Sequence, residues 1–282
     1  MAGPLTTPIP AQIGDMSDSH DVSFEFPSIE HPALLRELLE EAKRRAVPIH
    51  RVSMGGGTRM LTNGERDDML SQAHEHGIDV YSFISSRNSF ENLVDKGAGE
   101  QLRGEVAFHD AIEELYRCSE WGIDGVLLAD LGFLDAANKL RISGDLHGLA
   151  FKTSVAIAPM NATAAALYER LGATSINVSG SSTIDDLGAM RSRLSGSTTL
   201  DIYIEISSDL SGGLRYRDAA ALVEAAAPVH LKFGLLNAPN LYPYGAHLEP
   251  IALKVTREKI RRAELVCEEL MRAGVCINGR GG

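Results

Sequence analysis

Short runs of apolar or alternating residues, rich in Val and Ile, recur from residue 21 onward and alternate with longer segments of helical period. This alternation is typical of repeated strand–helix units. The predicted strands cover residues 22–26, 49–54, 78–84, 123–129, 152–158, 174–179, 199–206 and 228–233. The predicted helices cover residues 31–46, 64–76, 105–120, 131–141, 161–171, 183–193, 215–226 and 253–273.

Residues at the predicted helix ends support these boundaries. Pro32 follows His31 in a first turn, and Gly77 and Gly274 each follow the end of a predicted helix. Eight strand–helix units in about 255 residues predict an α/β fold, a single (β/α)8 TIM-type barrel over residues 21–282. A doubly wound open sheet is the alternative. Residues 1–20, which are polar and contain three prolines, predict an extended or disordered arm.

Two connections are longer than the usual 2–6 residues. One runs from Ser85 to Gly104 and the other from Gly234 to about Ala252. Both follow the carboxyl ends of predicted strands, where barrel enzymes place their active sites, so we interpret them as lid or substrate-binding loops. Tolerated surface insertions are the alternative interpretation.

Polar side chains interrupt strands that a barrel buries on both faces. Because neighbouring strand residues point to opposite faces, the polar positions that alternate with apolar ones are predicted to point into the barrel. Four pairs of residues are expected to share an inward face, each pair on its own strand. They are His230 with Lys232, Ser53 with Arg51, Ser179 with Asn177, and Tyr203 with Glu205. The charged or amide residues of this interior set are Glu25, Arg51, Asp130, Asn177, Glu205 and Lys232.

Charges buried in a barrel are costly unless they are paired or bind a ligand. We therefore interpret the interior set as a polar active site at the carboxyl-terminal mouth. A structural network, for example Glu205 paired with Lys232 on the adjacent strand, is the alternative. A shift of one residue in strand register would reverse every inward assignment.

The interior set is compatible with more than one chemistry. Three carboxylates, Glu25, Asp130 and Glu205, are oxygen ligands of the kind that hold Mg, Mn or Zn, so a divalent metal is one expectation. Without a metal, one carboxylate acts as a general base whose pKa is set by burial and by Lys232 or Arg51. Lys232 binds a substrate anion or forms a Schiff base.

Two loops and several polar side chains extend the candidate site. The loop from Ser208 to Arg215 follows a strand and is a candidate anion site. The glycine-rich turn from Met54 to Arg59 also follows a strand and could present N–H groups to an anion, although a plain flexible turn is the favoured interpretation. His247 lies in the last long connection. The residues expected to bind substrate are Arg51, Ser53, Asn161, Asn177, Ser179, Tyr203, Arg215 and His247.

Composition limits the function classes. The 282 residues include 27 basic and 38 acidic side chains, a formal charge of −11, and no local basic patch, so nucleic acid is not expected as a partner. The three cysteines show no CxxC spacing, which favours a reducing compartment. With no long apolar run or signal peptide, we expect a cytoplasmic protein that does not bind membranes. The arm and apolar helices favour a homo-oligomer.

Three short motifs carry a family resemblance. They are Asp124-Gly125-Val126-Leu127-Leu128-Ala129-Asp130-Leu131-Gly132, Met160-Asn161 and Leu231-Lys232. Over about residues 123–234 the chain resembles the collagenase-like peptidase family U-32. The resemblance implies a barrel with its site around Asp130, Asn161 and Lys232.

The chain also departs from that family. Glu205-Ile206-Ser207-Ser208 stands where the family usually has a His-Gly pair and cysteines, so no iron–sulfur cluster is expected. After Lys232, the family's glutamate and arginine are replaced by Gly234 and Leu235, so its protease or RNA-modifying role does not transfer.

The sequence therefore predicts a hydrolase-like barrel enzyme, related to that family, which acts on a small polar or amide-containing substrate. Glu205 or Glu25 would activate water, while Lys232 and Arg51 stabilise negative charge. One alternative is a carbon–carbon lyase or aldolase that uses a divalent metal or a Schiff base on Lys232. Another is a subunit that binds a small molecule without catalysis.

Overall fold

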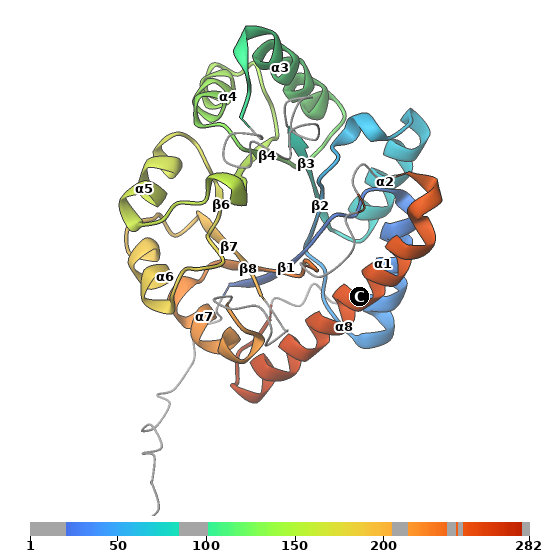
Figure 1. Cartoon of the computed structure of the whole chain (residues 1–282), viewed down its shortest axis with the longest axis vertical. Coiled ribbons are helices and arrows are strands. Elements are labelled where there is room, and N and C mark those ends of the chain that lie inside the picture. The colour runs from blue at the N-terminus through green and yellow to red at the C-terminus, as the bar shows by residue number, and fades with distance from the viewer. Residues whose placement is uncertain (1–20, 85–100, 205–213, 236–240, 242–244, 278–282) are drawn as a thin grey trace, which may run out of the picture.

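The computed structural model describes residues 21–84, 101–204, 214–235, 241 and 245–277. Within these residues the chain forms eight parallel strands that close into a barrel in sequence order (Figure 1). The (β/α)8 prediction is confirmed, and the open sheet is wrong. The strands are β1 (Val22–Pro27), β2 (Arg51–Met54), β3 (Asp79–Ile84), β4 (Gly125–Leu128), β5 (Ala150–Thr153), β6 (Ser175–Asn177), β7 (Thr199–Tyr203) and β8 (Val229–Lys232).

The helices form a ring around the strands (Figure 1). Several begin where the sequence supplies a cap: His31 Nδ1 accepts a hydrogen bond from the Ala33 N–H, and Thr62 and Glu65 form a reciprocal capping box. They are α1 (Pro32–Arg45), α2 (Asn63–Glu75), α3 (Gly104–Glu120), α4 (Leu131–Ser143), α5 (Ala162–Arg170), α6 (Ile184–Arg191), α7 (Ala219–Ala226) and α8 (Glu249–Arg272).

The largest differences from the predicted boundaries occur at three elements. β5 begins at Ala150 and ends at Thr153, because Ser154 caps a 3-10 turn at Val155–Ile157 where the strand was expected to continue. A 3-10 turn at Tyr216–Asp218 precedes α7 in the segment predicted as one helix. α8 begins earlier than predicted, at Glu249, so the long connection before it is shorter. The expected arm and most of the connection after β3 lie outside the described residues.

The apolar core lies between the strands and the surrounding helices. Outward-facing side chains pack there, for example Phe233, whose ring centroid lies 4.9 Å from that of Phe24 and 5.3 Å from that of Phe26. The register pairs Glu25 of β1 with Arg51 of β2 and with Lys232 of β8, which closes the barrel. The alternate positions of these strands therefore place polar groups at one level inside the barrel.

One strand residue makes room inside the barrel for an aromatic ring. A Cβ atom on Gly125 of β4 would lie 2.4 Å from Cζ of Tyr81 on β3, which is far too close for two carbon atoms.

Among the described residues, no helix has the length and apolar character needed to cross a membrane.

Candidate active site

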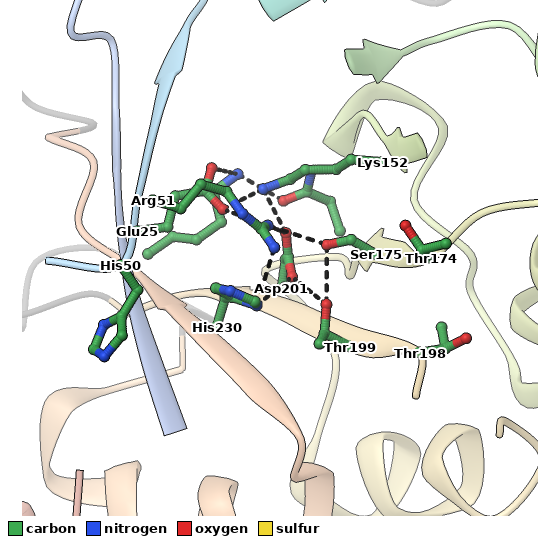
Figure 2. A network of polar contacts seen from close by, with 12 residues as sticks. Glu25, His50, Arg51, Lys152, Thr174, Ser175, Thr198, Thr199, Asp201 and His230 are labelled. Carbon is green, nitrogen blue, oxygen red and sulfur yellow. Dashed lines mark hydrogen bonds and ion pairs between the residues drawn. The ribbon is translucent and has the colours of Figure 1, made fainter. Parts of the chain in front are cut away.

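Polar side chains from strands on opposite sides of the barrel meet in its interior (Figure 2). Lys152 of β5 contacts both Glu25 of β1 and Asp201 of β7. Since β1 and β5 stand opposite each other in an eight-stranded ring, this contact passes through the barrel interior. The inward orientation predicted for Glu25 is confirmed. We call the interior network the group Glu25, Arg51, Ser53, Lys152, Ser175, Asn177, Asp201, His230 and Lys232.

The two carboxylate oxygens of Glu25 face different partners. Oε2 accepts hydrogen bonds from Arg51 Nη1 at 3.1 Å and from Lys152 Nζ. Oε1 accepts one from Ser53 Oγ at 3.1 Å and lies 3.5 Å from Lys232 Nζ. Burial alone would raise the pKa of Glu25, but the charges of Lys152, Lys232 and Arg51 outweigh burial and lower it to about 2. Glu25 is therefore ionised and surrounded by cations.

Asp201 forms a second buried centre of negative charge. Its Oδ2 lies 3.0 Å from Arg51 Nη1 and also contacts Lys152 Nζ. Burial would raise the pKa of Asp201, yet Lys152 and Arg51 hold it well below its ordinary value. His230 Nδ1 lies 3.4 Å from Asp201 Oδ1, and burial lowers the pKa of His230, with a further contribution from Arg51. His230 is therefore neutral at physiological pH.

Lys152 is the most enclosed cation of the network, with no exposed surface. Burial lowers the pKa of its amine to about 8, because the carboxylates of Asp201 and Glu25 only partly offset the loss of water, while the charges of Lys232 and Arg51 lower the pKa further. The ring of Tyr81 lies beside it, with its centroid 6.0 Å from Lys152 Nζ and 4.2 Å from Arg51 Cζ. A neutral amine is thus accessible to Lys152 near physiological pH.

Lys232 lies at the carboxyl-terminal edge of the barrel. Its Nζ donates a hydrogen bond to Asn177 Oδ1 at 2.7 Å and lies 4.2 Å from the centroid of the Tyr203 ring. Asn177 Nδ2 in turn donates to the carbonyl of Thr153 at 2.6 Å. All four residues are the last of their strands. Lys232 is therefore the amine of the network nearest the mouth at which barrel enzymes bind substrate.

Cationic side chains outnumber carboxylates in the network. Arg51, Lys152 and Lys232 stand against Glu25 and Asp201. In addition, Nε of Arg51 is buried and has no hydrogen-bond partner within the described part of the chain. Such an interior favours a bound anion over a bound cation.

Comparison with family models finds no match, and neither does comparison with curated proteins. Solved structures do match. A putative fructose-1,6-biphosphate aldolase from Coccidioides immitis has a TM-score of 0.56 at 8% identity, covering 89% of this chain and 93% of its own. The Rubisco-like protein from Rhodopseudomonas palustris has a TM-score of 0.54 at 12% identity, covering 92% of this chain and 66% of its own.

The chain has the TIM-barrel fold. At these identities the similarity extends to the fold alone. The U32 peptidase Mk0906 also matches, with a TM-score of 0.45 at 19% identity over 79% of this chain and 80% of its own. The resemblance of this TIM barrel to family U-32 is partial.

The structure brings together six of the predicted site residues, and each lies in a strand of the barrel. They are Glu25, Arg51, Ser53, Asn177, Tyr203 and Lys232. Glu205 lies outside the described residues. Lys152 and Asp201 were missed, although Asp201 stands two positions before Tyr203, on the face already predicted to point inward.

Five other predicted site residues lie outside the interior network. Asp130 caps α4, since its carboxylate accepts hydrogen bonds from the N–H groups of Phe133 and Leu102. It therefore does not join Glu25, and the inward assignment of Asp130 was wrong because β4 ends before it, at Leu128. The other four follow the carboxyl ends of β5 to β8: Asn161 caps α5, Ser179 Oγ pairs with Ser181, and Arg215 and His247 are exposed.

No group of three His, Cys, Asp or Glu side chains suited to a metal occurs among the residues described. Glu25, Asp130 and Glu205 were expected to form such a group. Within it, Glu25 is surrounded by donors from Arg51, Lys152 and Ser53, which compete with a divalent ion for its oxygens. The charge of the network thus disfavours a metal at Glu25.

The glycine-rich turn after β2 binds an anion, but one supplied by the chain. The N–H groups of Gly55 and Gly56 donate to the two carboxylate oxygens of Glu30, at 2.7 and 2.8 Å. Lys259 of α8 donates to the carbonyl of Ser28 at 3.3 Å and to that of Pro27. We call these residues the loop clamp, because they hold the segments after β1 and β2 against α8.

Proposed function

We propose that this TIM barrel is an enzyme that acts at its carboxyl-terminal mouth on a small substrate carrying a carboxylate or phosphate beside a carbonyl group. One observation carries the proposal: three cationic side chains meet two carboxylates inside the barrel, and the amine nearest the mouth, Lys232, belongs to this group. The excess of positive charge favours an anionic substrate. Nε of Arg51, which is buried and has no partner among the described residues, adds a donor for it.

In this proposal Lys232 acts on the carbonyl. Its neutral nitrogen would add to the carbonyl carbon, and loss of water would leave an imine. The protonated imine withdraws electrons from the neighbouring carbon–carbon bond, which is how a lyase or aldolase uses a lysine. Asn177 orients the amine through its 2.7 Å hydrogen bond, and the Tyr203 ring supports the cationic form.

Borohydride trapping tests this function. The protein is incubated with pyruvate, glyoxylate and dihydroxyacetone phosphate in turn, and sodium borohydride is added to reduce any imine. We expect a stable mass increase on the peptide that contains Lys232, absent in Lys232→Met. Lys139→Met removes a well-exposed lysine and is the matched control that keeps the adduct. If no probe modifies Lys232, the proposed amine chemistry is wrong.

Hydrolysis of an amide-containing substrate is the second candidate, favoured by the partial resemblance to family U-32 at Leu231 and Lys232. We rank it lower because a carboxylate with a pKa of about 2, such as Glu25, is a weak base at neutral pH. Hydrolysis of small amides and peptides by the purified protein, lost in Glu25→Gln but retained in Lys232→Met, would place hydrolysis first.

A further inference from the structure

Glu25 joins two lysines through different oxygens. Oε1 lies 3.5 Å from Lys232 Nζ, while Oε2 accepts a hydrogen bond from Lys152 Nζ. All three side chains are almost completely buried, so water has little access to either amine. A proton that leaves Lys232 therefore has one adjacent carboxylate and, behind it, one further base.

A lysine must lose a proton before its nitrogen attacks a carbonyl, because the ammonium form has no free electron pair. We propose that Glu25 relays this proton from Lys232 to Lys152. The inference rests on the proposed amine chemistry of Lys232. In the step, an N–H bond of Lys232 breaks and its proton forms an O–H bond with Oε1. Rotation of the neutral carboxyl group then turns this O–H toward Lys152, whose nitrogen takes the same proton. Glu25 is a carboxylate again at the end, Lys232 is neutral and Lys152 is an ammonium.

The surroundings of Lys152 suit a proton acceptor. The resulting ammonium is held by the carboxylates of Glu25 and Asp201, so both of its protonation states are supported. Ser175 of β6 and Gly125 of β4 add no charge from their strands. The titratable or charged groups that face Lys152 or its partners are Glu25 of β1, Arg51 of β2, Tyr81 of β3, Asp201 of β7, and His230 and Lys232 of β8.

The test measures the reactivity of Lys232 without a substrate. The folded protein is treated with formaldehyde and cyanoborohydride, and methylation of each lysine is followed by mass spectrometry, with the exposed Lys139 as internal standard. Lys152→Arg keeps the positive charge but accepts no proton, and Lys152→Met removes both. We expect methylation of Lys232 to fall at least about tenfold in both variants, with Lys139 unchanged.

A charge effect alone gives a different pattern. If Lys152 acts only through its charge, Lys152→Arg reacts like the wild type, and that result would overturn the relay.

The wild-type protein supplies a second measurement that needs no variant. Because the acceptor must be neutral, methylation of Lys232 is expected to rise about fivefold between pH 7 and pH 8 and then level off, as the amine of Lys152 titrates near pH 8. A rise that continues in parallel with Lys139 to pH 10 contradicts the relay.

The proposed function and the proton relay can be disproved independently of each other. If methylation follows the relay pattern but no carbonyl probe is trapped, the proposed function is wrong and the proton path remains. If pyruvate or another probe is trapped equally well in wild type, Lys152→Arg and Lys152→Met, the function remains and the relay is wrong. Circular dichroism of each variant confirms that the fold is retained.

Discussion

Burial lowers the pKa of two lysines in this TIM barrel, and their surroundings differ. Burial lowers the pKa of both Lys152 and Lys259 to about 8. Lys259 belongs to the loop clamp and donates to the backbone carbonyls of Pro27 and Ser28. The charge of Glu30, whose oxygens accept hydrogen bonds from Gly55 and Gly56, partly offsets the effect of burial on the pKa of Lys259. Lys152 belongs to the interior network, where both of its partners are carboxylates and one of these contacts a further lysine. A perturbed pKa therefore marks a functional candidate only where the partners can also exchange a proton or bind a ligand.

Removal of Glu25 is expected to have the largest effect on stability. Glu25→Leu leaves Arg51, Lys152 and Lys232 with only Asp201 to balance them in a buried site, and this should lower the free energy of unfolding by about 3 to 5 kcal/mol. Urea unfolding followed by circular dichroism measures the change. Glu113→Leu, at an exposed position of α3, is the control and should change stability little. A near-neutral result for Glu25→Leu would mean that the network is not tightly coupled.

Removal of Lys259 is expected to cost less and to leave the site unchanged. Lys259→Met removes the donor to the carbonyls of Pro27 and Ser28, which should cost about 1 to 3 kcal/mol. Methylation of Lys232 in this variant should stay within about twofold of the wild type, because the hydrogen bonds of Lys259 within the described residues go to Pro27 and Ser28 and not to the network. A fall as large as that in Lys152→Arg would erase the distinction between the two regions.

Ligands should distinguish the two regions as well. An anion such as pyruvate or phosphate that binds at ten times its Kd should stabilise the folded protein by about 1.4 kcal/mol, while Mg²⁺ and Mn²⁺ should not stabilise it. Thermal unfolding of wild type, Lys232→Met and Lys259→Met with each ion measures this. The anion effect is expected to be absent in Lys232→Met alone. Stabilisation by Mn²⁺ that is lost in Glu25→Gln would restore the metal hypothesis for Glu25.

A change of one pH unit is expected to have the smallest effect per residue. Lys152 and Lys259 have lower pKa values in the folded than in the unfolded state, so between pH 8 and about 10 the unfolded chain binds more protons and stability rises with pH. Cys118 and Cys267, whose pKa values burial raises to about 12, oppose this rise above pH 9. From pH 8 to 9 we expect a gain of about 1 kcal/mol for each lysine, and Lys259→Met should lose half of the total. Urea unfolding at pH 8 and at pH 9 measures this change in the free energy of unfolding.

The fold was predictable because each strand and helix carries its own period, and eight repeats suffice to indicate a closed barrel. Alternation within strands was enough to find Glu25, Arg51 and Lys232. Lys152 was missed because the predicted strand began at that residue and its polar character was not weighed. Its partner could not have been predicted from local pattern, since the 127 residues that separate Lys152 from Glu25 are bridged only when the barrel closes.

Asp130 shows the opposite error, because it was assigned to the barrel interior but does not lie there. Alternation extended past the end of β4 assigned it to the interior, whereas the backbone turns there into α4 and the carboxylate satisfies the helix N-terminus. The residues of the glycine-rich turn after β2 allowed an anion site, although a plain flexible turn was the favoured interpretation. That the anion is Glu30, from the neighbouring segment, depends on tertiary contacts that no local motif contains.

The ring of Tyr81 fits inside the barrel because position 125 has no side chain. The two positions are therefore constrained to change together over evolution. A larger residue at 125 forces the aromatic ring out of the lumen, which separates it from the guanidinium of Arg51. Among homologous sequences, glycine at 125 should accompany an aromatic residue at 81, and a smaller residue at 81 should be found wherever 125 is larger.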